Sequence, residues 1–162
     1  MHLTFDDMDL AEIEASFAEH WGGLVVTPEG TFRAQDVLGV AAILESGERA
    51  AIATWVVESG GGQVVTLDAI IPGQGYGRSL LAEVERRICE SGGRQARLFS
   101  TNDNVVAIRI YLLAGYRVTR IFPDSMDAVR ALKPGVPLAG EFGLPLRDMW
   151  EFVKVLAPAT ED

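Results

Sequence analysis

The sequence predicts an α/β protein whose mixed, mostly antiparallel sheet is flanked by helices. Three strand-like segments separated by short turns occupy residues 37–71, and a glycine-rich segment followed by a helical pattern comes next. Strand and helix patterns then alternate up to residue 156. Short connections favour antiparallel neighbours, whereas alternation of strands with helices is typical of α/β chains. The combination therefore predicts a mixed sheet.

The first half of the chain predicts one helix and four strands. In Leu10–Trp21, apolar residues recur every three or four positions, and Gly22-Gly23 forms a helix stop. The predicted strands are Leu24–Thr27, Val37–Glu45, Ala50–Glu58 and Gln63–Ile71, and the last two turns are Ser46–Glu48 and Ser59–Gly62.

The second half begins with a helix that starts at Tyr76 and ends at Ser91-Gly92-Gly93. The later elements are a strand at Ala96–Ser100, a helix at Val105–Ala114, a strand at Tyr116–Phe122, a helix at Asp124–Leu132 capped by Asp124 or Ser125, a loop at Lys133–Asp148 and a strand at Met149–Leu156. We expect a single domain over residues 1–157 and a frayed tail at 158–162.

Composition narrows the class of protein. The 162 residues fit one domain, and 48% hydrophobic with 23% charged residues is the balance of a soluble globular protein. No apolar run reaches the roughly 18 residues of a membrane span, and the acidic N-terminus lacks the pattern of a secretory signal. With Cys89 as its one cysteine, the chain has no internal disulfide, which favours the cytoplasm.

The net charge of −9 argues against nucleic acid as a partner, because such a surface repels phosphate backbones. We also expect no metal site, because the two histidines and the single cysteine show no clustered spacing. Whether the chain forms a homodimer is left open.

The segment from Pro72 to Arg78 is the first chemical motif. Its three glycines can adopt backbone angles closed to other residues, so that successive N–H groups turn inward and bind an anion. The helix start adds free N–H donors and a positive dipole end, which together suit a pyrophosphate. A Walker A loop is excluded because no Gly-Lys-Ser/Thr is present, and a dinucleotide fold because the spacing is G-x-G-x-G.

The second motif runs from Asn104 to Tyr116, and with it the chain resembles the GNAT superfamily of N-acetyltransferases. Gly75 and Gly77 match the paired glycines of the GNAT loop. The GNAT helix motif is matched in order and spacing by Asn104, Ala107, Tyr111, Gly115 and Tyr116. Pro72 stands where that family has Gln or Arg, and Gln74 or Arg78 would have to compensate for it.

The resemblance extends to a bacterial GNAT subgroup whose acceptor we cannot name. It rests on Thr101–Asn104, Leu132-Lys133-Pro134 and Pro145–Asp148. The first sixty residues are compatible with the family without being diagnostic of it.

The resemblance implies acetyl-CoA as the acyl donor, lying between two splayed strands, Gln63–Ile71 and Ala96–Ser100. The cofactor-binding residues it implies are Ala69 and Ile70 for the pantetheine arm, Gly73, Gln74, Gly75, Tyr76, Gly77 and Arg78 for the pyrophosphate, and Asn104 for the arm. Tyr111 would protonate the leaving thiolate after direct attack by a small amine or a peptide amine. The identity of that amine is not readable from the sequence.

Asp68 is the best-placed carboxylate for the general base. Strand alternation puts Val65, Leu67, Ala69 and Ile71 on one face, and Val64, Thr66, Asp68 and Ile70 on the other. A carboxylate among apolar neighbours needs either a partner or a raised pKa, and a raised pKa suits a base that works near neutrality. Glu58, Glu141 and Asp148 are weaker candidates.

Each assignment has a plainer alternative. Tyr111 could be a core aromatic residue, Asn104 only a helix cap, and Asp68 a structural link to a neighbouring loop. Two other functions also remain open: a sensor that binds acyl-CoA without turnover, and a partner domain that has kept the fold but lost the cofactor.

Overall fold

The structure is a computed structural model that describes residues 2–156, so the tail expected at 158–162 lies outside the described residues. Contacts divide the chain into two compact units. Among the described residues, the first comprises residues 2–25, 32–96 and 155–156, and the second comprises Val26–Thr31 and Arg97–Lys154. Each is described by itself below, and the single domain remains a prediction. Among the described residues, no helix combines the length and the apolar character needed to cross a membrane.

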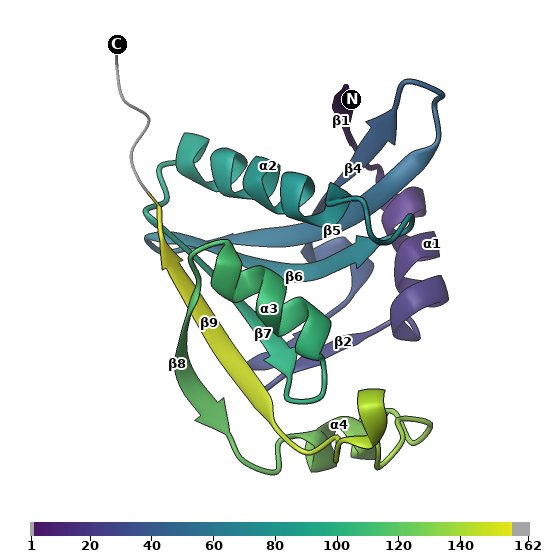
Figure 1. The fold of residues 1–162 in the computed structure, drawn as a ribbon, viewed down its shortest axis with the longest axis vertical. Helices are drawn as coiled ribbons and strands as arrows, with labels where there is room; N and C mark the ends of the chain where they lie inside the picture. The colour runs from purple at the N-terminus through teal and green to yellow at the C-terminus, as the bar shows by residue number, and fades with distance from the viewer. Residues whose placement is uncertain (1, 157–162) are drawn as a thin grey trace. The chain divides into compact units, whose positions relative to one another are not determined.

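The first unit contains four antiparallel strands and two long helices (Figure 1). In sheet order, the strands are β1 (Leu3–Asp7), β4 (Leu38–Leu44), β5 (Arg49–Glu58) and β6 (Gly61–Ala69). The helices are α1 (Leu10–Trp21) and α2 (Tyr76–Glu90), with a short 3₁₀ helix η1 at Ala34–Asp36. The predicted antiparallel arrangement of the three central strands is confirmed.

Helix α1 has the limits that its sequence predicts. Asp9 and Glu12 form a reciprocal capping box, with two N–H to carboxylate distances of 2.8 Å. Gly22 ends the helix with a φ of 65°, which few other residues adopt readily.

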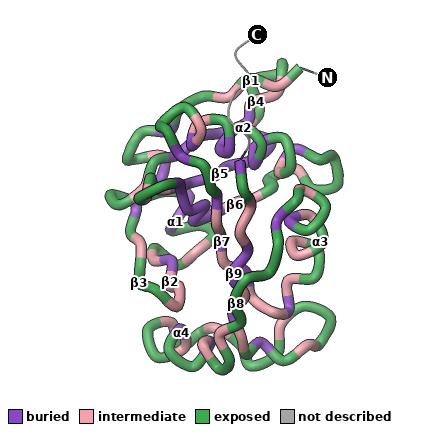
Figure 2. The backbone as a smooth tube through the Cα atoms, turned by 90° about the vertical axis from the view of Figure 1, so that its left-hand side faces the viewer, coloured by how far each residue is buried: buried purple, intermediate pink, exposed green. Residues whose placement is uncertain are grey.

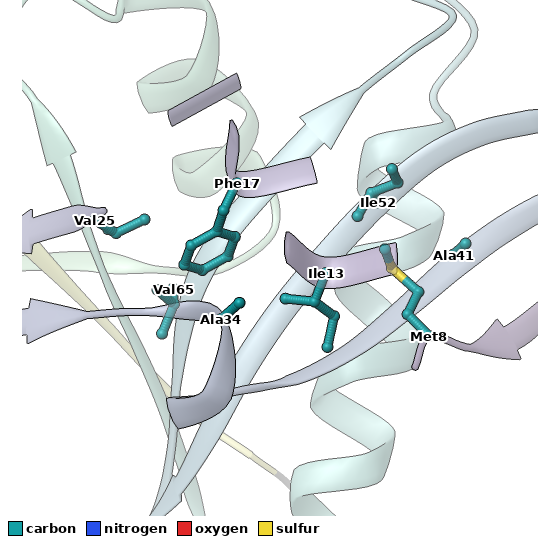
Figure 3. Close-up of a cluster of buried hydrophobic side chains, with 8 residues drawn as sticks. All are labelled: Met8, Ile13, Phe17, Val25, Ala34, Ala41, Ile52 and Val65. Atoms are coloured by element: carbon teal, nitrogen blue, oxygen red, sulfur yellow. The ribbon is translucent and has the colours of Figure 1, made fainter. Parts of the chain in front are cut away.

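Helices α1 and α2 cover opposite faces of this unit's sheet. Ile13 and Phe17 of α1 pack in an apolar cluster with Ala41 of β4, Ile52 of β5 and Val65 of β6 (Figure 3). Helix α2 packs on β4, β5 and β6, where its Ile88 lies against Gly62. Burial on both faces explains why β5 and β6 carry long buried runs (Figure 2).

Strand β6 begins two residues earlier than predicted. The sequence assigned Gly61 and Gly62 to a turn, but both are strand residues at close approaches. A Cβ on Gly61 would lie 2.1 Å from the carbonyl oxygen of Gln95, and one on Gly62 would lie 2.7 Å from the Ile88 side chain. These glycines are therefore explained by packing, which a one-dimensional pattern does not distinguish from a turn.

Strand β1 was not predicted. It pairs with β4 from Leu3 opposite Leu44 to Asp7 opposite Val40. Its sequence, LTFDD, is short and acidic, and its burial pattern is mostly exposed. An edge strand of this kind is stabilised by its neighbour, so its own sequence carries little signal.

The second unit holds the alternating part of the chain. Its elements are β7 (Gln95–Thr101), which enters from the first unit, α3 (Val105–Leu113), β8 (Arg117–Phe122), α4 (Met126–Leu132), the 3₁₀ helix η2 (Glu141–Gly143) and β9 (Met149–Val155). The strand order is β7-β9-β8, and β8 and β9 are antiparallel. Strands β2 (Val25–Thr27) and β3 (Gly30–Phe32) form a separate hairpin.

Helix α4 starts two residues later than predicted, and Ser125, one of the two predicted caps, is its N-cap residue without a side-chain cap bond. Asp124 has a φ of 57°, outside the helical region, and Ser125 makes no side-chain cap bond. The Ser125 hydroxyl instead accepts a hydrogen bond of 2.8 Å from the Met149 N–H. The Ser125 hydroxyl, which the sequence suggested as a helix cap, is therefore used in a tertiary hydrogen bond to the start of β9.

A network of charges ties the β2–β3 turn to the strands of the second unit. The buried carboxylate of Glu151 accepts hydrogen bonds from Arg120, Thr119 and Arg97, and both arginines also pair with Glu29. The Arg120 hydrogen bonds above all hold the pKa of Glu151 down at about 2, although burial acts in the other direction. Glu151 is therefore ionised throughout the physiological range.

We expect Glu151→Gln to cost about 2 kcal/mol of unfolding free energy at pH 7, because the buried carboxylate loses its charge-assisted hydrogen bonds to Arg97 and to the half-exposed Arg120. Because the pKa of Glu151 is lower in the folded protein, its ionised carboxylate stabilises the fold at any pH above the unfolded pKa of about 4.5. This stabilisation is lost as the pH falls from there towards the folded pKa of about 2. The difference between wild type and variant in urea unfolding should therefore shrink over that range. Glu29→Gln is the control, since its more exposed pairs should cost less than about 1 kcal/mol. Equal losses for both variants, or a pH-independent penalty, would contradict this account.

Candidate active site

The glycine-rich segment after β6 adopts the backbone that the sequence predicts. Gly73 has a φ of 80° and Gly75 a φ of 78°, both in the left-handed region. Gly75 is the N-cap of α2, and its carbonyl oxygen accepts the Ser79 N–H at 3.1 Å. A Cβ at either glycine would meet nothing within 4 Å, so the chain's own packing leaves this space open.

Gly77 lies inside α2, so a left-handed backbone does not explain it. A Cβ there would meet only the Cβ of Ala69, at an ordinary 3.9 Å. Neither packing within the described residues nor a strained φ therefore requires glycine at this position. A glycine in the first turn of a helix costs stability relative to alanine, which suggests that the space above it is used by a ligand.

The N-terminus of α2 suits an anion. The helix has 15 residues, carries no acidic residue in its first turn, and receives no side-chain cap. Its first N–H groups lack intrahelical acceptors, and its dipole places positive charge there. Gln74 and Arg78 are exposed beside this end of the helix. The side chain of Tyr76 is buried, so Tyr76 contributes its backbone N–H group to the anion site. The residues present therefore fit a pyrophosphate.

At the end of β6, some backbone groups bond to β5 and others face the opposite edge of the strand. The N–H groups of Ile70 and Ile71 both donate to the Ala50 carbonyl oxygen of β5, at 2.9 and 3.1 Å. By alternation, Ala69 turns its N–H and C=O towards the strand edge away from β5. Ala69 is therefore better suited than Ile70 to pair with an extended ligand along that edge.

The face assignment of β6 from strict alternation is wrong at one point. Thr66 lies opposite Thr54 and Val64 opposite Trp55, so Val65 is an extra residue that forms a bulge. Val65 consequently packs in the α1 cluster together with Ile52, the residue opposite Asp68. Val65 and Asp68 thus share the α1 face, although alternation put them on opposite faces.

Asp68 lies half-buried on this face, next to the end of α1. The indole N–H of Trp21 donates a hydrogen bond of 2.8 Å to its Oδ2. Burial raises the pKa of the Asp68 carboxyl, and this effect outweighs the Trp21 hydrogen bond and the charge of His20, which both lower it. The raised pKa expected from the sequence has its cause in desolvation.

Trp21 is the residue at this site that the sequence analysis missed, since its helical spacing predicted only a core position. The ring does pack against the α1 cluster, but its N–H reaches 47 residues along the chain to Asp68. A buried indole N–H usually finds an acceptor, and that general rule was the available signal.

Asn104 and Tyr111 belong to helix α3 in the second unit. The side chain of Asn104 accepts the Ala107 N–H at 3.2 Å, so Asn104 is the N-cap of the helix. The buried ring of Tyr111 packs against Tyr116 and Phe152, with centroid distances of 6.1 and 5.6 Å. The plainer alternatives for both residues are thus present, and each is compatible with a further role.

Two of the three segments that resemble the bacterial subgroup, Thr101–Asn104 and Pro145–Asp148, contact each other. The side chain of Asn102 donates to the Pro145 carbonyl oxygen at 2.7 Å and accepts the N–H groups of Arg147 and Asp148 at 3.0 Å each. Beside it, Asp103 accepts the Glu141 N–H at 3.0 Å. The segment before α3 therefore anchors the Pro- and Gly-rich loop over 133–148 at two points.

Asp68, Ala69, Ile70 and the residues from Gly73 to Arg78 thus follow one another in the first unit, whereas Asn104 caps helix α3 of the second unit and Tyr111 lies within it. Among the weaker base candidates, the Asp148 carboxylate accepts the Asp124 N–H at 2.8 Å. Within residues 2–156, no cluster of His, Cys, Asp or Glu has the geometry to hold a metal ion.

Comparisons with known proteins give two relatives of similar length. The chain is 37% identical over 145 residues to the uncharacterized protein YdhI of Bacillus subtilis, covering 86% of this chain and 88% of the relative. It is 30% identical over 145 residues to the uncharacterized protein YxbD of the same organism, covering 89% and 91%. No family model matches the chain.

Solved structures with the same fold are acetyltransferases. An IAA acetyltransferase from Bacillus cereus superposes with a TM-score of 0.75 at 15% identity, covering 96% of this chain and all of that one. A Bacillus subtilis acetyltransferase in complex with CoA gives 0.72 at 14% identity, with coverage of 96% and 100%. A GNAT family acetyltransferase from Elizabethkingia anophelis with acetyl-CoA bound gives 0.70 at 13% identity, with coverage of 95% and 98%.

Proposed function

Because the chain belongs to the family of Bacillus subtilis YdhI and YxbD and has the GNAT acetyltransferase fold, we propose that it transfers the acetyl group of acetyl-CoA to a primary amine. The observation that carries this proposal is the pair of left-handed glycines leading into an α2 N-terminus free of acidic residues. Similar structures that hold CoA or acetyl-CoA support the choice of donor.

In this proposal, the backbone N–H groups from Gly73 to Arg78 bind the pyrophosphate, with Gln74 and Arg78 replacing the side chain that Pro72 lacks. Ala69 pairs with the pantetheine arm through the backbone groups that it turns away from β5, Ile70 lies next to it along the arm, and Asn104 binds the arm in addition to capping α3. The thioester supplies the activated acyl carbon. No protein nucleophile is assigned, because Cys89 lies in the last turn of α2 with Ile88 of the core beside it.

The chain's own side chains move the protons. Asp68 takes a proton from the ammonium form of the acceptor, which frees the nitrogen lone pair for attack on the acyl carbon. The Tyr111 hydroxyl gives a proton to the departing sulfur. The acceptor is a small amine or a peptide amine, and we place the reaction in the cytoplasm.

We expect CoA to stabilise the protein. A ligand that binds only the folded state at 100 times its dissociation constant adds about 2.7 kcal/mol of unfolding free energy. The measurement is the melting temperature with and without millimolar CoA. Absence of any shift would contradict CoA binding, whereas binding without CoA release across a panel of polyamines, amino acids, peptides and aminoglycosides would favour a sensor.

The loop itself is tested by Gly77→Asp, with Gly77→Ala as the matched control. Both variants remove a helix glycine with open space around its Cβ, so both should melt at or above the wild-type temperature. An acidic residue in the first turn even favours the helix dipole. The Asp variant should nevertheless bind CoA at least about tenfold more weakly than the Ala variant, since one charge repulsion of about 1.4 kcal/mol has that effect. Equal CoA affinity in the two variants would show that the loop is only a turn.

A further inference from the structure

Asp68 presents its two carboxylate oxygens differently. Oδ2 accepts the Trp21 indole N–H at 2.8 Å, and this is the one hydrogen bond that the described residues give the carboxylate. Asp68 is only half-buried, and Oδ1 takes no part in this hydrogen bond. One oxygen is therefore fixed by the protein, while the other is accessible to a ligand.

The Trp21 side chain is itself held in place. It is the last residue of α1, directly before the left-handed Gly22 that ends the helix. Its ring packs against the apolar cluster of α1 and β6, and the preceding residue, His20, acts on Asp68 by lowering the pKa of its carboxyl electrostatically. On the other side, β5 places the apolar Ile52 opposite Asp68. The bulge at Val65 sets the register in which Asp68 meets the indole.

We propose that Trp21 is a positioning residue for acyl transfer, holding Oδ2 of Asp68 so that Oδ1 faces the acceptor amine. This inference rests on the proposed function. The assisted step is a proton transfer: an N–H bond of the acceptor ammonium breaks, an O–H bond forms on Asp68, and the electron pair stays on the nitrogen.

The indole N–H has a second effect, because it donates to the ionised form of the carboxylate and so opposes the rise in pKa caused by burial. Without it, Asp68 stays protonated up to a higher pH. A base must be ionised to act, so the acid limb of the pH–rate profile moves upward when the N–H is lost.

The test compares wild type with Trp21→Phe, which keeps an aromatic ring in the cluster but removes the N–H. The Asp68 carboxyl is titrated by ¹³C NMR, assigned with the Asp68→Asn spectrum, and turnover is followed from pH 5 to 9 with an accepted amine. We expect the Asp68 titration and the acid limb to move together to higher pH. Turnover on the acid side should fall by roughly tenfold, as one hydrogen bond to a charged group implies, while the high-pH plateau and CoA affinity are kept.

Trp150→Phe is the control, since it removes an indole of the second unit and should leave the Asp68 titration unchanged. If Trp21→Phe does not fold, β-(3-benzothienyl)alanine at position 21 replaces the N–H by sulfur within the same ring shape, and the same two titrations are read.

Three results would overturn the inference, and they are distinguishable. An unchanged Asp68 titration would show that Trp21 does not hold the carboxylate. A shifted titration with an unmoved acid limb would remove Asp68 and Trp21 from catalysis, while intact CoA binding and turnover would leave the acyltransferase standing. Failure of wild type to acetylate any amine would overturn the proposed function, and with it the positioning role.

Discussion

Tyr111→Phe is expected to lower turnover by about 10²- to 10⁴-fold, which corresponds to roughly 3 to 5 kcal/mol of barrier, because a general acid then has to be replaced by water. The ring contacts with Tyr116 and Phe152 persist in the variant, so the melting temperature should stay near that of wild type. Affinity for CoA should also change little. The measurement is single-turnover release of CoA with an amine identified by the panel.

Tyr116→Phe is the matched control, since it removes a hydroxyl from the neighbouring ring of the same aromatic group. It should leave turnover within about threefold, a change near 0.7 kcal/mol. A Tyr111→Phe variant as active as this control would reduce Tyr111 to a packing residue. If its turnover and melting temperature fell together, the hydroxyl would instead be holding structure.

Asp68→Asn should produce a loss of similar size, about 10²- to 10⁴-fold, because the amide keeps the shape of the carboxylate but takes up no proton. Stability should not fall with it. Burial raises the pKa of Asp68, so the folded state disfavours the ionised carboxylate, and this penalty applies once the pH rises above the unfolded pKa. The variant removes the penalty and should melt at or above the wild-type temperature at pH 8.

Glu58→Gln is the control for Asp68→Asn, since Glu58 closes β5 and is one of the weaker base candidates. If Glu58→Gln were as inactive as Asp68→Asn, or if raising the pH restored Asp68→Asn, Asp68 would not be the base. Turnover of both variants is measured across the pH range with saturating acetyl-CoA.

Several elements were readable from the sequence because local physics decides them. The limits of α1 follow from apolar spacing and from Gly22, and α2 starts at Tyr76 because Gly75 is left-handed. The order of strands and helices from β4 to β9 and the glycine loop were also predicted correctly, whereas β1 and β3 were not predicted. Each of these rests on neighbours within a few residues, which is the range of a periodic pattern or a helix cap.

Other features depended on contacts far apart in the sequence. Gly61 and Gly62 appeared to form a turn because the Gln95 and Ile88 atoms that crowd them lie about 30 residues away along the chain. Strand β1 was overlooked because its partner β4 supplies the stability that its own acidic sequence lacks. The prediction from sequence was therefore wrong at both places: closely packed strand glycines were assigned to a turn, and an edge strand was not recognised.

The residue types at the site were determined by the sequence alone: the glycines of the loop, the Asn104 cap, and a carboxylate near the end of β6. Only the tertiary structure decided how they are presented. The bulge at Val65 alters the alternation of β6 and so sets the face on which Asp68 lies. No residue pattern in the sequence predicts this bulge. Trp21 reaches Asp68 because α1 packs on that face, and burial there raises the carboxyl pKa. Burial and long-range hydrogen bonds are properties of the packed chain, and a sequence read one residue at a time contains the groups but not their environment.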